Sequence, residues 1–151
     1  MISMTAFPTF PDTSDCVIRL ASSDLSKEEL VKKIIALNDA GHTVQLFDAN
    51  NINSRLHILG AYVNARVSFQ DKSNVSKTIA TEMLLFASMT TQISEAIRKL
   101  GIKNTKKFIV FADCEESYSS ARKLFKDVEE FRGFDDDIKV LREMAEARLG
   151  N

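Results

Sequence analysis

The sequence has no tryptophan, only two cysteines and two prolines, and no apolar run that approaches the length of a membrane-spanning helix. Its five glycines are too few for a collagen-like or low-complexity chain. Residues 1–15 lack the basic and apolar regions of a secretory signal. These absences predict a soluble, cytoplasmic protein without contact to a membrane.

The two cysteines, Cys16 and Cys114, belong to no closely spaced pair and to no cluster with histidine. Structural zinc sites and redox-active motifs need such spacing. A cytoplasmic protein rarely holds a stable disulfide. We therefore expect two reduced thiols and no metal site.

Charge is distributed unevenly along the 151 residues, although the net charge is only -1. Residues 53–107 carry a net charge of +6, whereas residues 1–52 carry -3 and residues 108–151 carry -4. Local fields steer association even when the net charge is near zero. The basic middle segment is therefore either a binding surface for an anionic partner or a solvated face.

Apolar, β-branched stretches alternate with capped amphipathic segments. The predicted strands are residues 16–21, 43–48 and 107–112; the last is apolar on both faces and is expected at the centre of the sheet. The predicted helices cover residues 26–40, 53–69, 77–89 and 91–100, a stretch after Asp113, and a segment that begins near Asp136. We predict one α/β (α+β) domain over residues 1–151, a small mixed sheet packed by five or six helices, with residues 1–14 flexible.

Several local signals refine these elements. Ser26 and Glu29 form a capping box, and Gly41 is expected to end the first helix. The strand, helix and strand at the start favour a parallel pair joined by a right-handed crossover. The other signals are a buried stripe on the second helix (Ile52, Leu56, Leu59, Val63, Val67), a Schellman-type ending at Gly101 and Ile102, and a capping box of Asp113 and Glu116.

No catalytic constellation is visible. The sequence contains no glycine-rich nucleotide loop, no nucleophile elbow and no HExxH motif. We interpret His42 as a turn residue and His57 as a semi-buried, hydrogen-bonded helix residue, because no serine or cysteine beside them is activated. The three carboxylates at residues 135–137 favour a helix N-terminus over a metal site. We therefore predict no catalytic residue, cofactor or metal, and no small-molecule substrate.

Glu82 is the one carboxylate within an apolar helix, in the segment TEMLLFA. A buried, unpaired carboxylate would be costly. The side chain therefore points to solvent, bonds Arg or Lys from a neighbouring helix, or marks a binding cleft. Pairing or exposure is the preferred interpretation.

The middle of the chain resembles a known family. The familiar pieces are Phe47-Asp48-Ala49 at a strand end, a helix with His57, Ala61, Asn64 and Ala65, a Glu82-Met83-Leu84 helix, and the run Gln92, Ile93, Ala96, Ile97, Gly101, Ile102. In this order and spacing, over residues 43–112, they resemble the PRPK-binding subunit family of the KEOPS complex. The short chain without extensions is more similar to the archaeal members.

The resemblance implies a non-catalytic role. Members of that family bind a small atypical kinase/ATPase of the PRPK type, in a complex that makes threonylcarbamoyladenosine in tRNA, and archaeal members recruit tRNA through its single-stranded 3′ CCA end. The basic middle segment is compatible with phosphate contacts. A stand-alone RNA-binding module and a small α/β enzyme remain as alternatives.

Two sets of residues follow as candidate sites. We expect a tRNA-binding face to include Arg55, Arg66, Lys77, Arg98 and Lys99. We expect a kinase-binding patch on the last helix to include Ile138, Leu141, Met144, Ala145 and Leu149, partly exposed in the free protein; plain core packing of that helix is the alternative.

Overall fold

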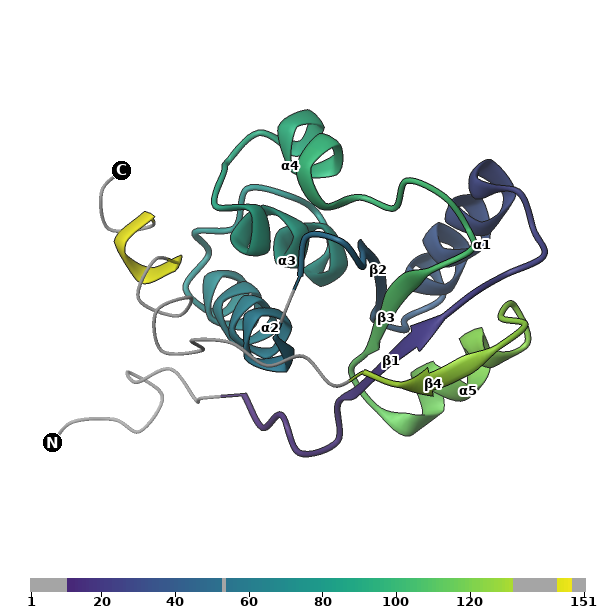
Figure 1. Ribbon diagram of the computed structural model, residues 1–151. Helices are drawn as coiled ribbons and strands as arrows, with labels where there is room; N and C mark the ends of the chain where they lie inside the picture. The colour runs from purple at the N-terminus through teal and green to yellow at the C-terminus, as the bar shows by residue number, and fades with distance from the viewer. Residues whose placement is uncertain (1–10, 53, 132–143, 148–151) are drawn as a thin grey trace, which may run out of the picture.

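The structure is a computed structural model that describes residues 11–52, 54–131 and 144–147. Five helices and four strands have defined bounds in these ranges, and a further helical turn covers residues 144–147 (Figure 1). In chain order the elements are β1 (Val17–Ala21), α1 (Lys27–Asp39), β2 (Val44–Asp48), α2 (Arg55–Gln70), α3 (Ile79–Ser88), α4 (Ile93–Leu100), β3 (Phe108–Ala112), α5 (Glu115–Arg122) and β4 (Val128–Glu130).

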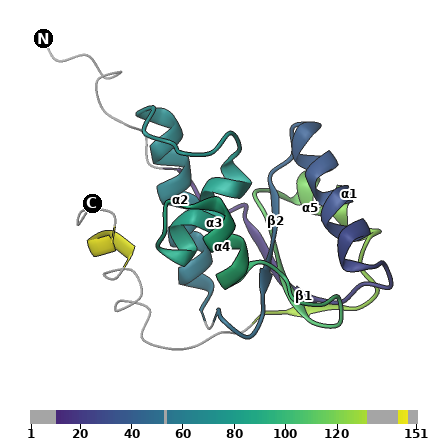
Figure 2. The ribbon, with the colours of Figure 1, turned by 90° about the horizontal axis from the view of Figure 1, so that it is seen from above.

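The strands form one sheet in the order β2-β3-β1-β4, and every pairing in it is antiparallel. Helices α2, α3 and α4 cover one face, and α1 and α5 cover the other (Figure 2). The α+β architecture with a small sheet and six helical segments is thus as predicted. Strand β3 lies at the centre, as expected from its apolar sequence, and all five of its residues are buried.

The expected pairing of the first two strands is wrong. Strands β1 and β2 do point the same way, but β3 lies between them and pairs antiparallel with both. The sheet is therefore antiparallel throughout and not mixed. The physical reason is burial, since the strand that is apolar on both faces takes the position covered on both sides. Strand β4, which pairs with β1 at the far edge, was not predicted.

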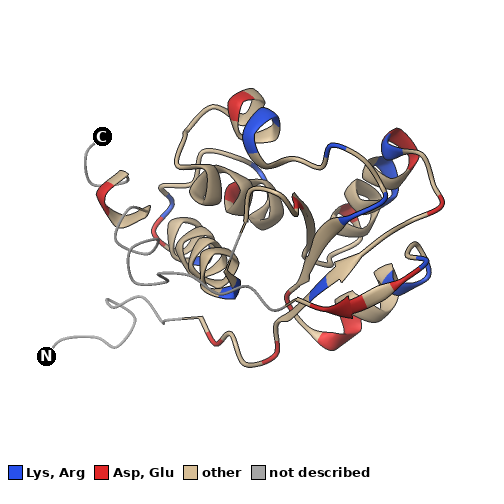
Figure 3. Ribbon diagram, viewed as in Figure 1, with Lys and Arg blue, Asp and Glu red and all other residues tan. Residues whose placement is uncertain are grey.

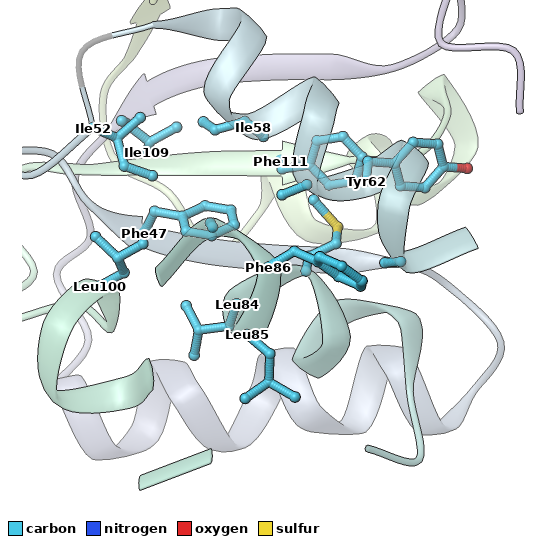
Figure 4. Packing of buried hydrophobic residues seen from close by; sticks show 14 of the residues in the cluster. Phe47, Ile52, Ile58, Tyr62, Leu84, Leu85, Phe86, Leu100, Ile109 and Phe111 are labelled. Carbon is cyan, nitrogen blue, oxygen red and sulfur yellow. The ribbon is translucent and has the colours of Figure 1, made fainter. Parts of the chain in front are cut away.

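Side chains alternate between two cores, one on each face of the sheet. Ile109 and Phe111 of β3 pack with Phe47, Tyr62 and the helices α2 to α4 (Figure 4). Phe108, Val110 and Ala112 point the other way and pack beneath α1 and α5. The Phe111 and Tyr62 rings lie 5.1 Å apart between centroids. Strand β3 therefore contributes side chains to both hydrophobic cores.

The helix ends match the local signals in part. Ser26 caps α1 by accepting a hydrogen bond from the Glu29 amide, and Gly41 has a φ of +102°, as a glycine stop requires. Gly101, however, has a φ of -65°, so the helix before it does not end in the left-handed conformation of a Schellman motif. The N-cap of α5 is Cys114, without a side-chain hydrogen bond, in place of the expected capping box.

The buried face of α2 also differs from the predicted stripe. Leu56 is exposed, and the other three aliphatic residues of the stripe that lie within α2 are half-buried. The residues that are buried are Ile58, Ala61, Tyr62, Ala65 and Ser68. Ala61, Ala65 and Ser68 are small, which allows close packing of α2, and Ile58 and Tyr62 supply the large buried side chains of this face.

Within the described ranges, no helix is both long and apolar enough to cross a membrane.

Candidate functional site

Glu82 is completely buried on α3, and its carboxylate is held by four donors. Oε1 accepts hydrogen bonds from the Ser76 amide (2.9 Å) and hydroxyl (2.8 Å), and Oε2 accepts one from the Ser68 hydroxyl (3.0 Å). The Val75 amide lies 3.1 Å from both oxygens. The preferred interpretation of exposure or pairing with Arg or Lys is therefore wrong, because hydroxyls and main-chain amides take that role. Glu82 thereby holds the loop between α2 and α3, which includes Lys77.

The end of α4 carries a group of basic side chains beside a hollow on the surface. Arg98, Lys99 and Lys103 line it together with His57 from α2. Asn51 and the C-terminal end of α3 complete its wall. Figure 3 shows the basic residues of α4 in blue, at the top of the view. The hollow therefore offers cations next to hydrogen-bonding groups, an arrangement suited to phosphate. We call it the basic hollow.

The groups around the basic hollow are held in place by hydrogen bonds. His57 Nε2 lies 2.8 Å from the Ala87 carbonyl oxygen and donates to it. Lys103 Nζ donates to the carbonyl oxygens of Arg98 (2.5 Å) and Gly101 (3.0 Å) and so caps the C-terminus of α4. Glu95 accepts a hydrogen bond from Arg98, which lowers the pKa of that carboxyl.

Of the five residues expected on a tRNA-binding face, the structure brings Arg98 and Lys99 together in the basic hollow. Arg66 lies elsewhere on α2, where its guanidinium donates to the Tyr62 hydroxyl (2.6 Å) and lies over the ring. Arg55 is the half-buried first residue of α2, and Lys77 is exposed just before the N-cap of α3. These three residues do not line the basic hollow.

Two of the five residues expected to bind a kinase fall within the described ranges. Met144 is 2% exposed and lines a small hollow with Leu85, Phe86 and Met89. Ala145 is exposed. Ile138, Leu141 and Leu149 lie outside the described residues. The expected partial exposure of Met144 is therefore wrong, because its side chain packs against the C-terminal half of α3, whereas Ala145 is exposed.

A histidine and two serines meet on the other face of the sheet, which sequence reasoning missed. His42 Nδ1 lies 3.2 Å from the Ser117 hydroxyl, and Nε2 lies 3.3 Å from the Ser120 hydroxyl. Both ring nitrogens therefore lie within hydrogen-bond distance of a serine hydroxyl on α5. The only local signal was the spacing of the two serines on one face of α5. These two hydrogen bonds hold α5 against the turn before β2.

The thiol of Cys16 is poorly suited to nucleophilic catalysis. Burial, with a smaller contribution from the negative charge of Asp113, raises the pKa of Cys16 to about 12. The thiolate is the nucleophilic form, so Cys16 is unreactive near neutral pH. Both cysteines are free, as expected. In the described part of the chain, no three His, Cys, Asp or Glu side chains converge to hold a metal ion, and residues 135–137 lie outside it.

Comparison with known proteins gives a match to one family. A search of the curated proteins found no match. The sequence model of the family described as kinase binding protein CGI-121 matches residues 23–146. That range runs from the loop before α1 to the helical turn that holds Met144, and it includes the basic hollow and the Glu82 cluster. With most of its length matched, the chain belongs to the CGI-121 family of kinase binding proteins.

Proposed function

We propose that this protein is a non-catalytic KEOPS subunit that binds and regulates the PRPK-type kinase and recruits tRNA through the 3′ CCA end for threonylcarbamoyladenosine formation. The observation that carries the proposal is the match to a kinase-binding family over residues 23–146. The histidines and Cys16 support it, because their hydrogen bonds and the raised pKa of Cys16 suit structural roles.

The kinase contact is assigned to the C-terminal helical segment and the adjoining end of α3. Met144 packs there beside Leu85, Phe86 and Met89, and Ala145 is accessible. Apolar residues beside an accessible surface are typical of an interface. Ile138, Leu141 and Leu149 belong to the same proposed patch.

A pull-down with the purified PRPK-type kinase from the same source tests this assignment. We expect the wild-type protein to bind, and we expect Leu141→Glu to abolish binding, because a carboxylate would be buried in an apolar contact. Lys33→Glu on the exposed side of α1 is the matched charge control and should bind as wild type. Circular dichroism checks that both variants are folded. Kinase binding that survives Leu141→Glu would place the interface elsewhere.

The tRNA contact is assigned to the basic residues of the middle segment, with the basic hollow as its centre. Arg98 and Lys99 line the hollow, and Arg55, Arg66 and Lys77 would extend the contact along α2 and the start of α3. Phosphate contacts supply affinity that depends on salt and not on sequence. A single-stranded end adds stacking and base-edge contacts, for which His57 and Met89 are available in the hollow.

Binding to tRNA should fall steeply with salt and should weaken again when the CCA end is removed. Each lost phosphate contact lowers the log–log salt slope by roughly 0.7–0.9. We therefore expect Lys99→Glu and Lys77→Glu to reduce affinity and the slope, and Lys33→Glu to leave both unchanged. Fluorescence anisotropy at two salt concentrations, with full-length and CCA-less tRNA and without the kinase, gives these values. An affinity indifferent to both reversals and to the tail would remove tRNA from the proposed function.

A further inference from the structure

A groove of about 320 Å³ runs along α1 at the open edge of the sheet. One wall is α1, and the other is the first half of α3 together with α4; Gln45 and Leu46 of β2 form part of the floor. Strand β2 ends the sheet on this side, between helices that cover opposite faces (Figure 2). We call this feature the edge groove.

The edge groove gathers most of the large apolar side chains that are exposed in the described part of the chain. Val31 (36% exposed) and Ile35 (56%) stand on α1, and Ile93 (42%) and Ile97 (54%) stand on α4. Each pair has i, i+4 spacing and so forms a ridge along its helix. Only two other large hydrophobic residues of the described chain, Leu56 and Val75, are exposed to this degree. Such a concentration marks an interaction site.

The outer edge of β2, at the floor of the edge groove, is already hydrogen-bonded to side-chain amides and is not free to pair with a further strand. The Val44 amide donates to Asn38 Oδ1 (3.2 Å), and the Val44 carbonyl accepts from Asn38 Nδ2 (2.8 Å). The Leu46 amide donates to Gln45 Oε1 (2.9 Å), and Gln45 Nε2 donates to the Ala80 carbonyl (2.7 Å). An added strand would have to displace these side-chain amides. A segment that satisfies its own main chain, namely an α-helix, needs no such displacement.

Charges at the two ends of the edge groove give the occupant a direction. Lys27 lies at the start of α1 and Asp39 at its end, about 18 Å apart at 1.5 Å per residue. A helix carries partial positive charge at its N-terminus and partial negative charge at its C-terminus. The favourable orientation places the N-terminus of the occupant near Asp39 and its C-terminus near Lys27, antiparallel to α1.

We propose that the edge groove docks an amphipathic helix of a partner protein, antiparallel to α1, with apolar side chains at i, i+4, i+7 and i+11. Its first turn is basic and faces Asp39, and its last turn is acidic and faces Lys27. The site goes beyond the proposed function, because none of its lining residues lines the basic hollow or the hollow around Met144.

The test uses the purified chain and two displayed libraries of 18-residue peptides, one with the helical apolar pattern and one with strictly alternating apolar residues. We expect enrichment from the helical library alone. Synthetic copies of the selected peptides should bind at least tenfold more weakly to Ile35→Asp and Ile97→Asp. Both side chains are more than half exposed, so these variants should fold, which circular dichroism verifies. Val75→Asp changes a residue outside the groove that is 50% exposed, and this variant should bind as wild type.

Charge-reversal variants test the proposed direction of the bound helix. Asp39→Lys and Lys27→Glu should each weaken the selected peptides several-fold, and peptides with exchanged terminal charges should bind these two variants better than they bind wild type. Enrichment of alternating peptides, enrichment of neither library, or binding that survives Ile97→Asp would overturn the proposal. A wild-type dimer in sedimentation that Ile97→Asp dissociates would also overturn it, because a second copy would then occupy the groove. Neither kinase nor tRNA is present, so failure here is distinct from failure of the proposed function.

Discussion

Replacing Glu82 by alanine should lower the free energy of unfolding by about 3–5 kcal/mol, a large part of the ~5–15 kcal/mol typical of a domain. The change leaves a cavity on α3 and removes the acceptor for the Val75 and Ser76 amides. A buried donor left without a partner costs about 1–3 kcal/mol, and the cavity adds to that cost. Chemical denaturation measures the loss, and hydrogen exchange should show faster exchange at Val75 and Ser76.

Glu82→Gln is the more conservative variant, and it should lower the free energy of unfolding by about half as much as Glu82→Ala does. The glutamine oxygen can replace Oε1 as acceptor for the Ser76 amide, and its NH2 group can donate to the Ser68 hydroxyl. That hydroxyl can in turn donate to the Ala65 carbonyl, 2.8 Å away. Glu129→Ala removes an exposed carboxylate from β4 and should change stability by less than about 0.5 kcal/mol. A Glu82→Ala protein as stable as this control would contradict the role assigned to the buried carboxylate.

Gly101→Ala should destabilise the protein by about 2–4 kcal/mol, although the backbone there suits any residue. A Cβ at this position would lie 2.5 Å from the Ile97 carbonyl oxygen and 3.2 Å from Ile97 Cγ2. The last turn of α4 would have to move, and with it Leu100 in one core and Ile102 in the other. Thermal denaturation measures the effect, and NMR should show shift changes around Ile97.

A glycine can be required because its backbone has a positive φ or because a Cβ would clash with a neighbouring atom. Gly41→Ala tests the first reason alone. A Cβ at Gly41 meets nothing within 4 Å, so only the positive φ of +102° opposes the substitution. Its expected cost is about 1–2 kcal/mol. A loss at Gly101 no larger than the loss at Gly41 would show that the last turn of α4 relaxes freely.

What could be predicted from the sequence was mainly local. The strand at residues 107–112 was placed correctly at the centre, because five consecutive apolar residues need cover on both sides. The first helix was bounded correctly by Ser26 and Gly41, whose effects act within one turn. The order of the strands was missed, because the partner of Val17 is Ala112, which no local pattern can indicate. Strand β4 was missed for the same reason, since its ValGluGlu sequence becomes a strand only through pairing with β1.

The candidate site was predicted in part. The sequence drew attention to Glu82 but not to its partners, because two serine hydroxyls and two loop amides carry no charge and therefore give no charge pattern in the sequence. It grouped five basic residues, of which only Arg98 and Lys99 share the basic hollow. The buried face of α2 was misjudged because large aliphatic residues were weighted above Ala61 and Ala65, although close helix contact favours small side chains. The edge groove escaped notice because its walls come from helices on opposite faces of the sheet.

The central position of β3 has a consequence for how the chain reaches its native state. Strands β1 and β2 are synthesised first, yet both bond to β3, which follows after three helices. No native strand pair exists until the ribosome has released residue 112, and each pair then closes a long loop. Pairings between distant parts of the chain slow folding, to the millisecond-to-second range in sheet-dominated domains. Helices α2 and α3 pack directly against each other and can assemble before β3 is synthesised. Their contact would bury apolar surface of the nascent chain during the time in which β1 and β2 have no partner strand.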